Sequence, residues 1–127
     1  MQDEPRPAEI LVAIANFLKG AATRETGPHI SFQLRVCANA AEICQRNLTL
    51  GPPAEAQELA RLKALLGMDG DLATLNRELS RRIRAGEMGF DTPGLIAHLW
   101  PTTMAKLAVD QPNYSGYRAA LAEQANA

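Results

Sequence analysis

The chain has 127 residues, with 13 Lys and Arg against 14 Asp and Glu and a formal net charge of −1. This length predicts a single domain, residues 1–127, that buries its core without disulfides or a structural metal. The balanced charge gives no reason to expect nucleic acid or an anionic membrane as a partner, and no apolar run approaches the roughly 20 residues that cross a bilayer. The acidic, proline-containing start is no secretory signal peptide, so we expect a cytoplasmic protein.

Composition favours helices over strands. Ala and Leu supply 38 residues, whereas Val and Ile supply 9. Ala and Leu lose little side-chain freedom in a helix, whereas β-branched residues suit a pleated sheet. No segment alternates β-branched and polar residues between turn signals. The sequence therefore predicts an all-α fold, a compact up-and-down bundle of about five helices.

The first helix is predicted from Pro7 to about Gly20, after a start at residues 1–6 that we expect to fray. Proline suits the first helical turn because its missing N–H is not needed there. The apolar residues that form one helical stripe are Ile10, Leu11, Ile14, Phe17 and Leu18.

The second helix, about His29 to Leu50, has an unusually broad apolar side. Two neighbouring rows cover roughly 200° of arc, which predicts a helix buried at the centre of the bundle. The rows consist of Ile30, Leu34, Cys37, Ala41, Cys44 and Leu48, and of Phe32, Val36, Ala40 and Ile43. Ser31 falls on the polar remainder. Gln33 and Asn47 fall on the apolar arc and Asn39 at its edge, where buried amides usually satisfy one another or a helix end.

Three further helices are predicted. Gly51-Pro52-Pro53 separates the second helix from a third, about residues 53–66, whose inner stripe is Leu59, Leu62 and Leu66. The fourth covers about residues 71–85, ends at Gly86, and has an inner stripe of Leu72, Leu75, Leu79 and Ile83. The fifth begins in Asp91-Thr92-Pro93, contains Pro101, and has an inner stripe of Leu95, Leu99, Thr103 and Leu107. The tail, residues 116–127, either adds a helical turn or frays.

The cysteines and histidines predict no metal site and no catalytic residue. Cys37 and Cys44 are about 10.5 Å apart along a helix axis, too far for a disulfide, so we expect reduced, buried thiols. Neither they nor His29 and His98 have the spacing of a zinc site. No cofactor-binding motif is present, so we expect none.

Residues 61–84 form a basic segment with a net charge of +3, whereas the rest of the chain has a net charge of −4. Two helices around a short turn resemble a helix-turn-helix in outline. However, leucines occupy the inner stripe and no aromatic residues interleave the arginines. The sequence favours a solvated face, with an anion-binding or acidic-partner surface as the first alternative and DNA binding as the second.

A polar pocket between helices is a further possibility that the sequence leaves open. It would be lined by Gln33, Asn39, Asn76, His98 and Trp100. Arg35 or Arg77 would then bind an acyl or phosphorylated ligand, since bundles commonly hold small molecules between their helices.

Three groups of residues carry a resemblance to a known family. They are Phe32-Gln33-Leu34-Arg35-Val36 with Ala38-Asn39-Ala40, Leu75-Asn76-Arg77-Glu78-Leu79 with Ile83-Arg84-Ala85-Gly86, and Lys106-Leu107-Ala108-Val109 with Gln111-Pro112-Asn113-Tyr114-Ser115. In this order they resemble a small bacterial helical domain family of unknown function, over about residues 3–115. Such domains occur alone, or beside or fused to aminoglycoside-phosphotransferase-like kinases and acyl-CoA dehydrogenases. The resemblance implies no catalytic residues.

The sequence therefore favours a non-enzymatic accessory or interaction domain. We expect a homodimer, because broad Ala and Leu faces allow close helix approach. The resemblance implies a kinase-like or acyl-CoA dehydrogenase partner. The acyl-CoA dehydrogenase-like label that some members carry is not expected to hold, because such an enzyme needs several hundred residues and a β domain. The alternative is a small-ligand binding protein or minor enzyme that uses the pocket above.

Overall fold

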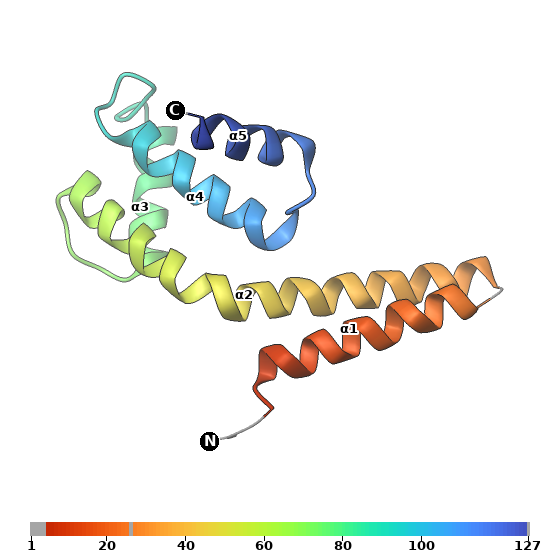
Figure 1. The fold of residues 1–127 in the computed structure, drawn as a ribbon. Helices are drawn as coiled ribbons and strands as arrows, with labels where there is room; N and C mark the ends of the chain where they lie inside the picture. The colour runs from red at the N-terminus through yellow and green to blue at the C-terminus, as the bar shows by residue number, and fades with distance from the viewer. Residues whose placement is uncertain (1–4, 26, 127) are drawn as a thin grey trace. The chain divides into compact units, whose positions relative to one another are not determined.

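The computed structural model describes residues 5–25 and 27–126. These residues form five helices and no strand (Figure 1). The helices are α1 (Pro7–Arg24), α2 (Pro28–Leu66), α3 (Leu72–Arg84), α4 (Leu95–Asp110) and α5 (Ser115–Ala125). The prediction of an all-α fold with about five helices is confirmed. Within the described part of the chain, no helix is both long enough and apolar enough to span a membrane.

The separation of a second and a third helix is wrong, because α2 runs through Gly51-Pro52-Pro53 without ending. A proline has a backbone φ near −65°, which is itself helical. Pro52 and Pro53 therefore remove two backbone hydrogen bonds from α2 without forcing the chain out of the helical conformation.

Other helix ends also differ from their predicted positions. α1 continues past Gly20 to Arg24, and α4 begins at Leu95, after a left-handed Gly94, rather than in Asp91-Thr92-Pro93. Gly86 follows α3 with φ of 72°, as expected of a glycine at a helix end. The tail forms α5 from Ser115 to Ala125. Of the start that we expected to fray, residues 1–4 lie outside the described residues.

The chain divides into two compact units, Met1–Leu50 and Gly51–Ala127. Helix α2 contributes its first part to the first unit and its last part to the second. Each unit has its own set of buried side chains, and each is described in turn.

The first unit is a hairpin of α1 and the first part of α2 (Figure 1). Its buried side chains are small: Ala15, Ala22 and Ala38 are each at most 4% exposed. The buried Ser31 hydroxyl donates a hydrogen bond to the carbonyl oxygen of Ala22, 3.0 Å away. Small side chains let two helix backbones approach closely, so this contact selects alanine and serine.

The predicted burial of two apolar rows on the second helix is wrong. Of the ten residues, only Leu34, Ala41 and Ile43 are half-buried, and the other seven are exposed. Phe32 and Val36 are 61% and 51% exposed. The buried positions are Ser31 and Ala38, which form a stripe about one residue away from the predicted one. The fully buried positions of the inner face have small side chains, whereas the bulky Phe32 and Val36 face outward.

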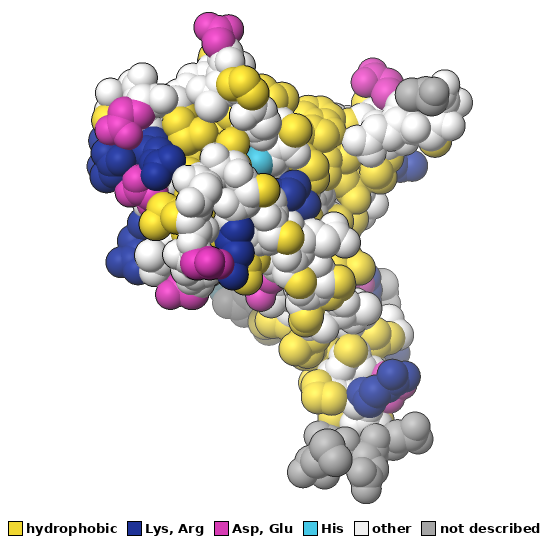
Figure 2. Space-filling view, turned by 90° about the vertical axis from the view of Figure 1, so that its left-hand side faces the viewer, with side chains coloured by type: hydrophobic (Ala, Val, Ile, Leu, Met, Phe, Trp, Pro, Cys, Tyr) yellow, Lys and Arg dark blue, Asp and Glu magenta, His cyan; other side chains and the backbone are white. Residues whose placement is uncertain are grey.

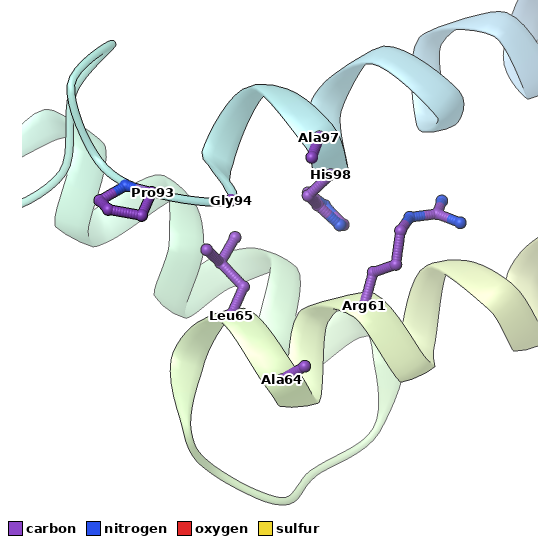
Figure 3. Close-up of a pocket in the computed structure, with 7 residues that line it drawn as sticks. All are labelled: Arg61, Ala64, Leu65, Pro93, Gly94, Ala97 and His98. Carbon is purple, nitrogen blue, oxygen red and sulfur yellow. The ribbon is translucent and has the colours of Figure 1, made fainter.

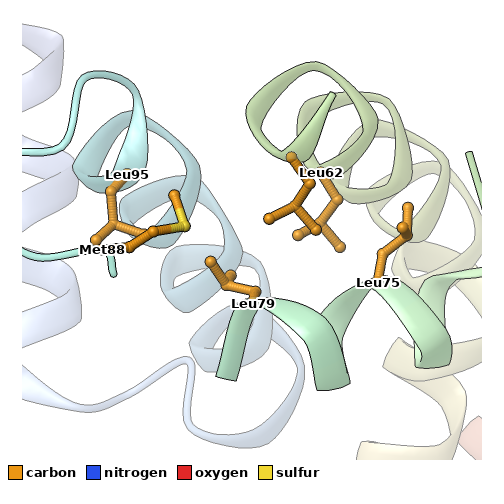
Figure 4. Close-up of a cluster of buried hydrophobic side chains, with 6 residues drawn as sticks. Leu62, Leu75, Leu79, Met88 and Leu95 are labelled. Atoms are coloured by element: carbon orange, nitrogen blue, oxygen red, sulfur yellow. The ribbon is translucent and has the colours of Figure 1, made fainter. Parts of the chain in front are cut away.

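The second unit is built on a leucine core between the end of α2, α3 and the start of α4 (Figure 4). The buried cluster is Leu62, Leu66, Leu75, Leu79, Met88 and Leu95. Leu62 and Leu75 have no exposed surface. The predicted inner stripes of residues 59–66 and 72–79 are confirmed by this cluster and its neighbours Leu59 and Leu72.

Two stripes in this unit differ from prediction. Ile83, at the end of the predicted α3 stripe, is 41% exposed. The inner face of α4 consists of Leu95, His98 and Thr102, whereas the predicted Leu99 and Thr103 are exposed. A polar inner face on α4 places a histidine and a threonine where they can meet polar groups of α2.

Candidate functional site

A pocket of about 310 Å³ lies in the second unit, between the last turns of α2 and the start of α4 (Figure 3). It is lined by Arg61, Ala64, Leu65, Pro93, Gly94, Ala97 and His98. The side chains of Arg61 and His98 both extend into the space between the two helices. Three of the lining residues are Ala or Gly, and their small size leaves the pocket open.

Arg61 is held in place from one side. Its Nη2 donates to the Thr102 hydroxyl at 3.2 Å, and that hydroxyl donates to the His98 carbonyl oxygen at 2.9 Å. In contrast, the buried Nε of Arg61 and the buried Nδ1 of His98 have no hydrogen-bond partner among the described residues. Two residues that line the pocket therefore each have a buried nitrogen that the described residues do not satisfy.

His98 is buried, with 2% of its surface exposed. Burial lowers the pKa of the His98 imidazole below its ordinary value, and the nearby Arg61 charge lowers it further, against a smaller opposite effect of Glu58. The imidazole is therefore neutral at neutral pH. In that state one ring nitrogen donates and the other accepts a hydrogen bond.

Gly94 shapes the pocket through its backbone. Its φ is +84°, and a Cβ there would lie 3.4 Å from Leu65 Cδ1. Because the left-handed conformation costs an L-residue about 1–2 kcal/mol, we expect Gly94→Ala to lower the free energy of unfolding by about that amount, measured by urea denaturation. Gly89→Ala is the matched control, since a Cβ at Gly89 would meet nothing within 4 Å; an equal loss in both variants would contradict this reason.

A second hollow, of about 430 Å³, lies along α1 in the first unit. Its lining is mostly apolar and consists of Pro5, Glu9, Ile10, Ala13, Ile14, Phe17 and Leu18. Phe17 is 69% exposed and Ile14 is 44% exposed. The predicted stripe of α1 therefore exists, but part of it lines an open groove.

Comparison with family models matches residues 24–114 to a domain of unknown function, DUF6285. The chain belongs to the DUF6285 family. The match covers α2, α3 and α4, and so includes the leucine core and the Arg61–His98 pocket, whereas the α1 groove lies before it. The expected family of unknown function is confirmed over this range, which is shorter than the expected residues 3–115. Comparisons with curated proteins and with solved structures found no match.

The predicted pocket residues of this DUF6285 protein lie in two units. Gln33, Arg35 and Asn39 are exposed on the first part of α2. In the second unit, Trp100 is 49% exposed. A ligand site formed by these residues stays a prediction.

Of the predicted site residues, His98 lines the Arg61–His98 pocket. Asn76 is half-buried, and its Nδ2 donates to Glu58 Oε1 at 2.8 Å. Asn76 and Arg77 line another hollow, of about 350 Å³, on α3.

Arg61 is the charged residue of the pocket, and the site prediction missed it. Ala64 and Leu65 follow Arg61 by three and four residues, so all three lie on one side of α2. This spacing is the part of the pocket that the sequence contains. The spacing does not predict a pocket by itself, because it does not say that α4 is the helix that packs against this side of α2.

The basic segment forms ion pairs with nearby acidic residues. Arg81 and Arg82 both pair with Glu78, Arg81 also pairs with Glu87, and Lys63 pairs with Asp69. In the view of Figure 2, Lys and Arg side chains lie beside Asp and Glu side chains. This pairing supports a solvated face, and DNA binding stays the weaker alternative.

The Glu78 ion pairs predict an acid-sensitive helix α3. Hydrogen bonds from Arg81 and Arg82 lower the pKa of Glu78 to about 2. The stabilising effect is therefore complete above the ordinary pKa of 4.5 and is lost as the pH falls through the folded value. We expect Tm to fall between about pH 5 and pH 2, less steeply in Glu78→Gln and at high salt. Glu55→Gln should leave the Tm profile unchanged, and identical profiles for wild type and Glu78→Gln would contradict the assignment.

The expected burial of the two cysteines is wrong. Cys37 and Cys44 are both free and exposed. They lie on the outward face of α2 for the same reason as Phe32 and Val36, because the small residues face α1.

Proposed function

We propose that this DUF6285 protein is a non-enzymatic interaction module of the bacterial cytoplasm that self-associates through its hairpin of α1 and the first part of α2. The observation that carries the proposal is the distribution of side-chain size in the hairpin. Alanines are buried between the helices, whereas eight large apolar side chains are exposed and others, such as Leu11, Leu18 and Leu34, are half-buried. The exposed ones are Val12, Ile14, Phe17, Ile30, Phe32, Val36, Leu48 and Leu50.

Two helices in contact leave their remaining faces uncovered, whereas four helices enclose a core. The proposed occupant of the hairpin's apolar surface is therefore the same surface of a second copy, related by a twofold axis. Apolar patches of this kind on a protein surface mark interaction sites more often than chance exposure. A standard interface needs roughly 800 Å² from each partner, contributed by about 20–30 residues, which a hairpin of this length can supply.

Charge supports a second copy as the occupant. Residues 1–50 carry five basic and five acidic side chains, so the first unit has no net charge. Two identical neutral surfaces approach without repulsion, whereas a strongly charged surface would favour a partner of opposite sign.

The test is the mass of the full chain in solution. Multi-angle light scattering over a concentration series should give twice the chain mass of 13.7 kDa. A mass of one chain at every concentration would contradict self-association, and would indicate instead that the hairpin's apolar surface is covered within the chain or by a different protein.

A protein partner is the second part of the proposal. The resemblance in the sequence favours a kinase-like or acyl-CoA-metabolising enzyme encoded nearby. Co-expression of the chain with such a neighbouring enzyme should yield a complex of fixed stoichiometry on size exclusion. Separate elution of the two proteins would remove the accessory role.

Small-ligand binding is the second candidate function, and the unsatisfied nitrogens of the Arg61–His98 pocket favour it. A thermal-shift screen with CoA thioesters and nucleotides tests it, because a ligand at 100 times its dissociation constant adds about 2.7 kcal/mol of stability. No shift with any compound would leave the interaction module as the function.

A further inference from the structure

We propose that the Arg61–His98 pocket binds an oxyanion, a carboxylate or a phosphate group, between the Arg61 guanidinium, the His98 imidazole and the first turn of α4. The proposal rests on the second candidate function, small-ligand binding, and names its ligand class. It does not depend on self-association, which uses the other unit.

The unsatisfied nitrogens indicate that the pocket is built for a ligand. Folded proteins rarely leave a buried polar atom without a partner, and each such atom calls for an explanation. Here two of them, Arg61 Nε and His98 Nδ1, belong to residues whose side chains line one pocket of about 310 Å³ (Figure 3). His98 is 98% buried, so bulk solvent does not satisfy its Nδ1. A guest oxygen accepts from Arg61 Nε, and a second oxygen accepts from His98 Nδ1 in the imidazole tautomer that has its proton on that nitrogen.

The charge around the pocket selects an anion. Arg61 is always protonated, and its guanidinium N–H groups donate most strongly to ionised oxygens. In the lining, Gly94 is the N-cap residue of α4 and Ala97 lies in its first turn, where a helix has amide N–H groups without a partner inside the helix and a partial positive charge. A metal cation is disfavoured by the same charges.

Glu58, which lies one helical turn before Arg61, forms its hydrogen bond with a residue outside the pocket. Glu58 Oε1 accepts a hydrogen bond from Asn76 Nδ2 on α3 at 2.8 Å, and Glu58 does not line the pocket. Among the described residues Glu58 therefore forms no ion pair with Arg61, although its charge partly offsets the effect of Arg61 on the His98 pKa.

The geometry of the pocket favours a small group. Thr102 anchors Nη2 of Arg61, which fixes the direction of the guanidinium before any ligand arrives. Ala64, Gly94 and Ala97 leave the space, and the volume is at the lower end of the range for small-molecule sites. The pocket therefore suits a small acid or the charged end of a larger molecule.

The test is a titration of the full-length ¹⁵N-labelled chain followed by NMR, with sodium phosphate in one series and sodium acetate in another, both at low ionic strength. We expect saturable shifts of the amides of residues 96–98 with at least one of the two anions. The responding anion identifies the oxyanion as phosphate, carboxylate or either. No saturable response of these amides to either anion would overturn the proposal.

Two variants separate a built site from general attraction to arginines. Arg61→Gln should weaken binding at least tenfold, whereas Arg84→Gln, at an exposed arginine of α3, should not change it. Ala97→Leu, which fills the pocket but keeps Arg61, should also abolish the response, and it serves if Arg61→Gln does not fold. Equal weakening by Arg61→Gln and Arg84→Gln would overturn the proposal.

The titration and the thermal-shift screen together separate the oxyanion site from small-ligand binding in general. If CoA thioesters or nucleotides stabilise the protein while phosphate and acetate neither bind nor compete with them, small-ligand binding stands and the oxyanion site is wrong. If no compound binds at all, both are wrong.

Discussion

Leu75→Ala is expected to lower the free energy of unfolding by about 2–5 kcal/mol, the usual cost of removing a buried leucine side chain and leaving a cavity. Leu75 has no exposed surface and lies in the leucine core of the second unit, between α3 and the end of α2 (Figure 4). Because whole domains are stable by only about 5–15 kcal/mol, this variant should approach the limit of folding. Urea denaturation followed by circular dichroism measures the change.

Ile83→Ala is the matched control for Leu75→Ala. Ile83 lies on the same helix, two turns later, but is 41% exposed and is not part of the core cluster. Surface substitutions usually change stability by no more than about 0.5 kcal/mol, so a partly exposed residue should cost far less than Leu75. A comparable loss in the two variants would show that the boundary of the core on α3 is wrong.

The second unit could be predicted from the sequence largely because its stripes consist of leucine. When the large apolar residues of a short helix form a single stripe, only that stripe can face the core. Leu62, Leu75 and Leu79 are buried, as the helical periodicity predicted. The first unit could not be predicted in the same way. On α2 the apolar residues outnumber the positions that one neighbouring helix can cover, so periodicity alone could not choose the inner face. The choice depends on the fit of Ala38 and Ser31 against α1.

Of the two polar residues that give the Arg61–His98 pocket its name, only His98 could be predicted from the sequence. His98 stands out as one of two histidines in the chain, and a polar ligand site was one of its possible uses. Arg61 resembles every other arginine of the basic segment until the structure shows its Nε buried without a partner. Such a difference depends on the packing of α2 against α4, and this contact joins residues about 40 positions apart.

Phe17→Asp is expected to convert the proposed dimer into a monomer. Phe17 is the most exposed of the large apolar residues in the first unit, at 69%, and it lines the α1 groove. A hot-spot side chain at the centre of an interface contributes about 2 kcal/mol or more, and a twofold symmetric interface contains the substitution twice. The dissociation constant should therefore rise by roughly a thousandfold or more, since every 1.4 kcal/mol is a factor of ten. Light scattering over a concentration series measures the change.

Phe90→Asp is the matched control for Phe17→Asp, because it introduces the same charge at a phenylalanine that is 91% exposed in the second unit. The proposal requires Phe90→Asp to remain dimeric and both variants to retain the helical circular dichroism of the wild type. Dissociation by Phe90→Asp alone would place the interface in the second unit. If the wild type is monomeric and Phe17→Asp lowers its Tm, the apolar surface is covered within the chain. The hairpin would then be part of the protein's own core, and its exposed phenylalanines would stabilise the fold rather than a dimer.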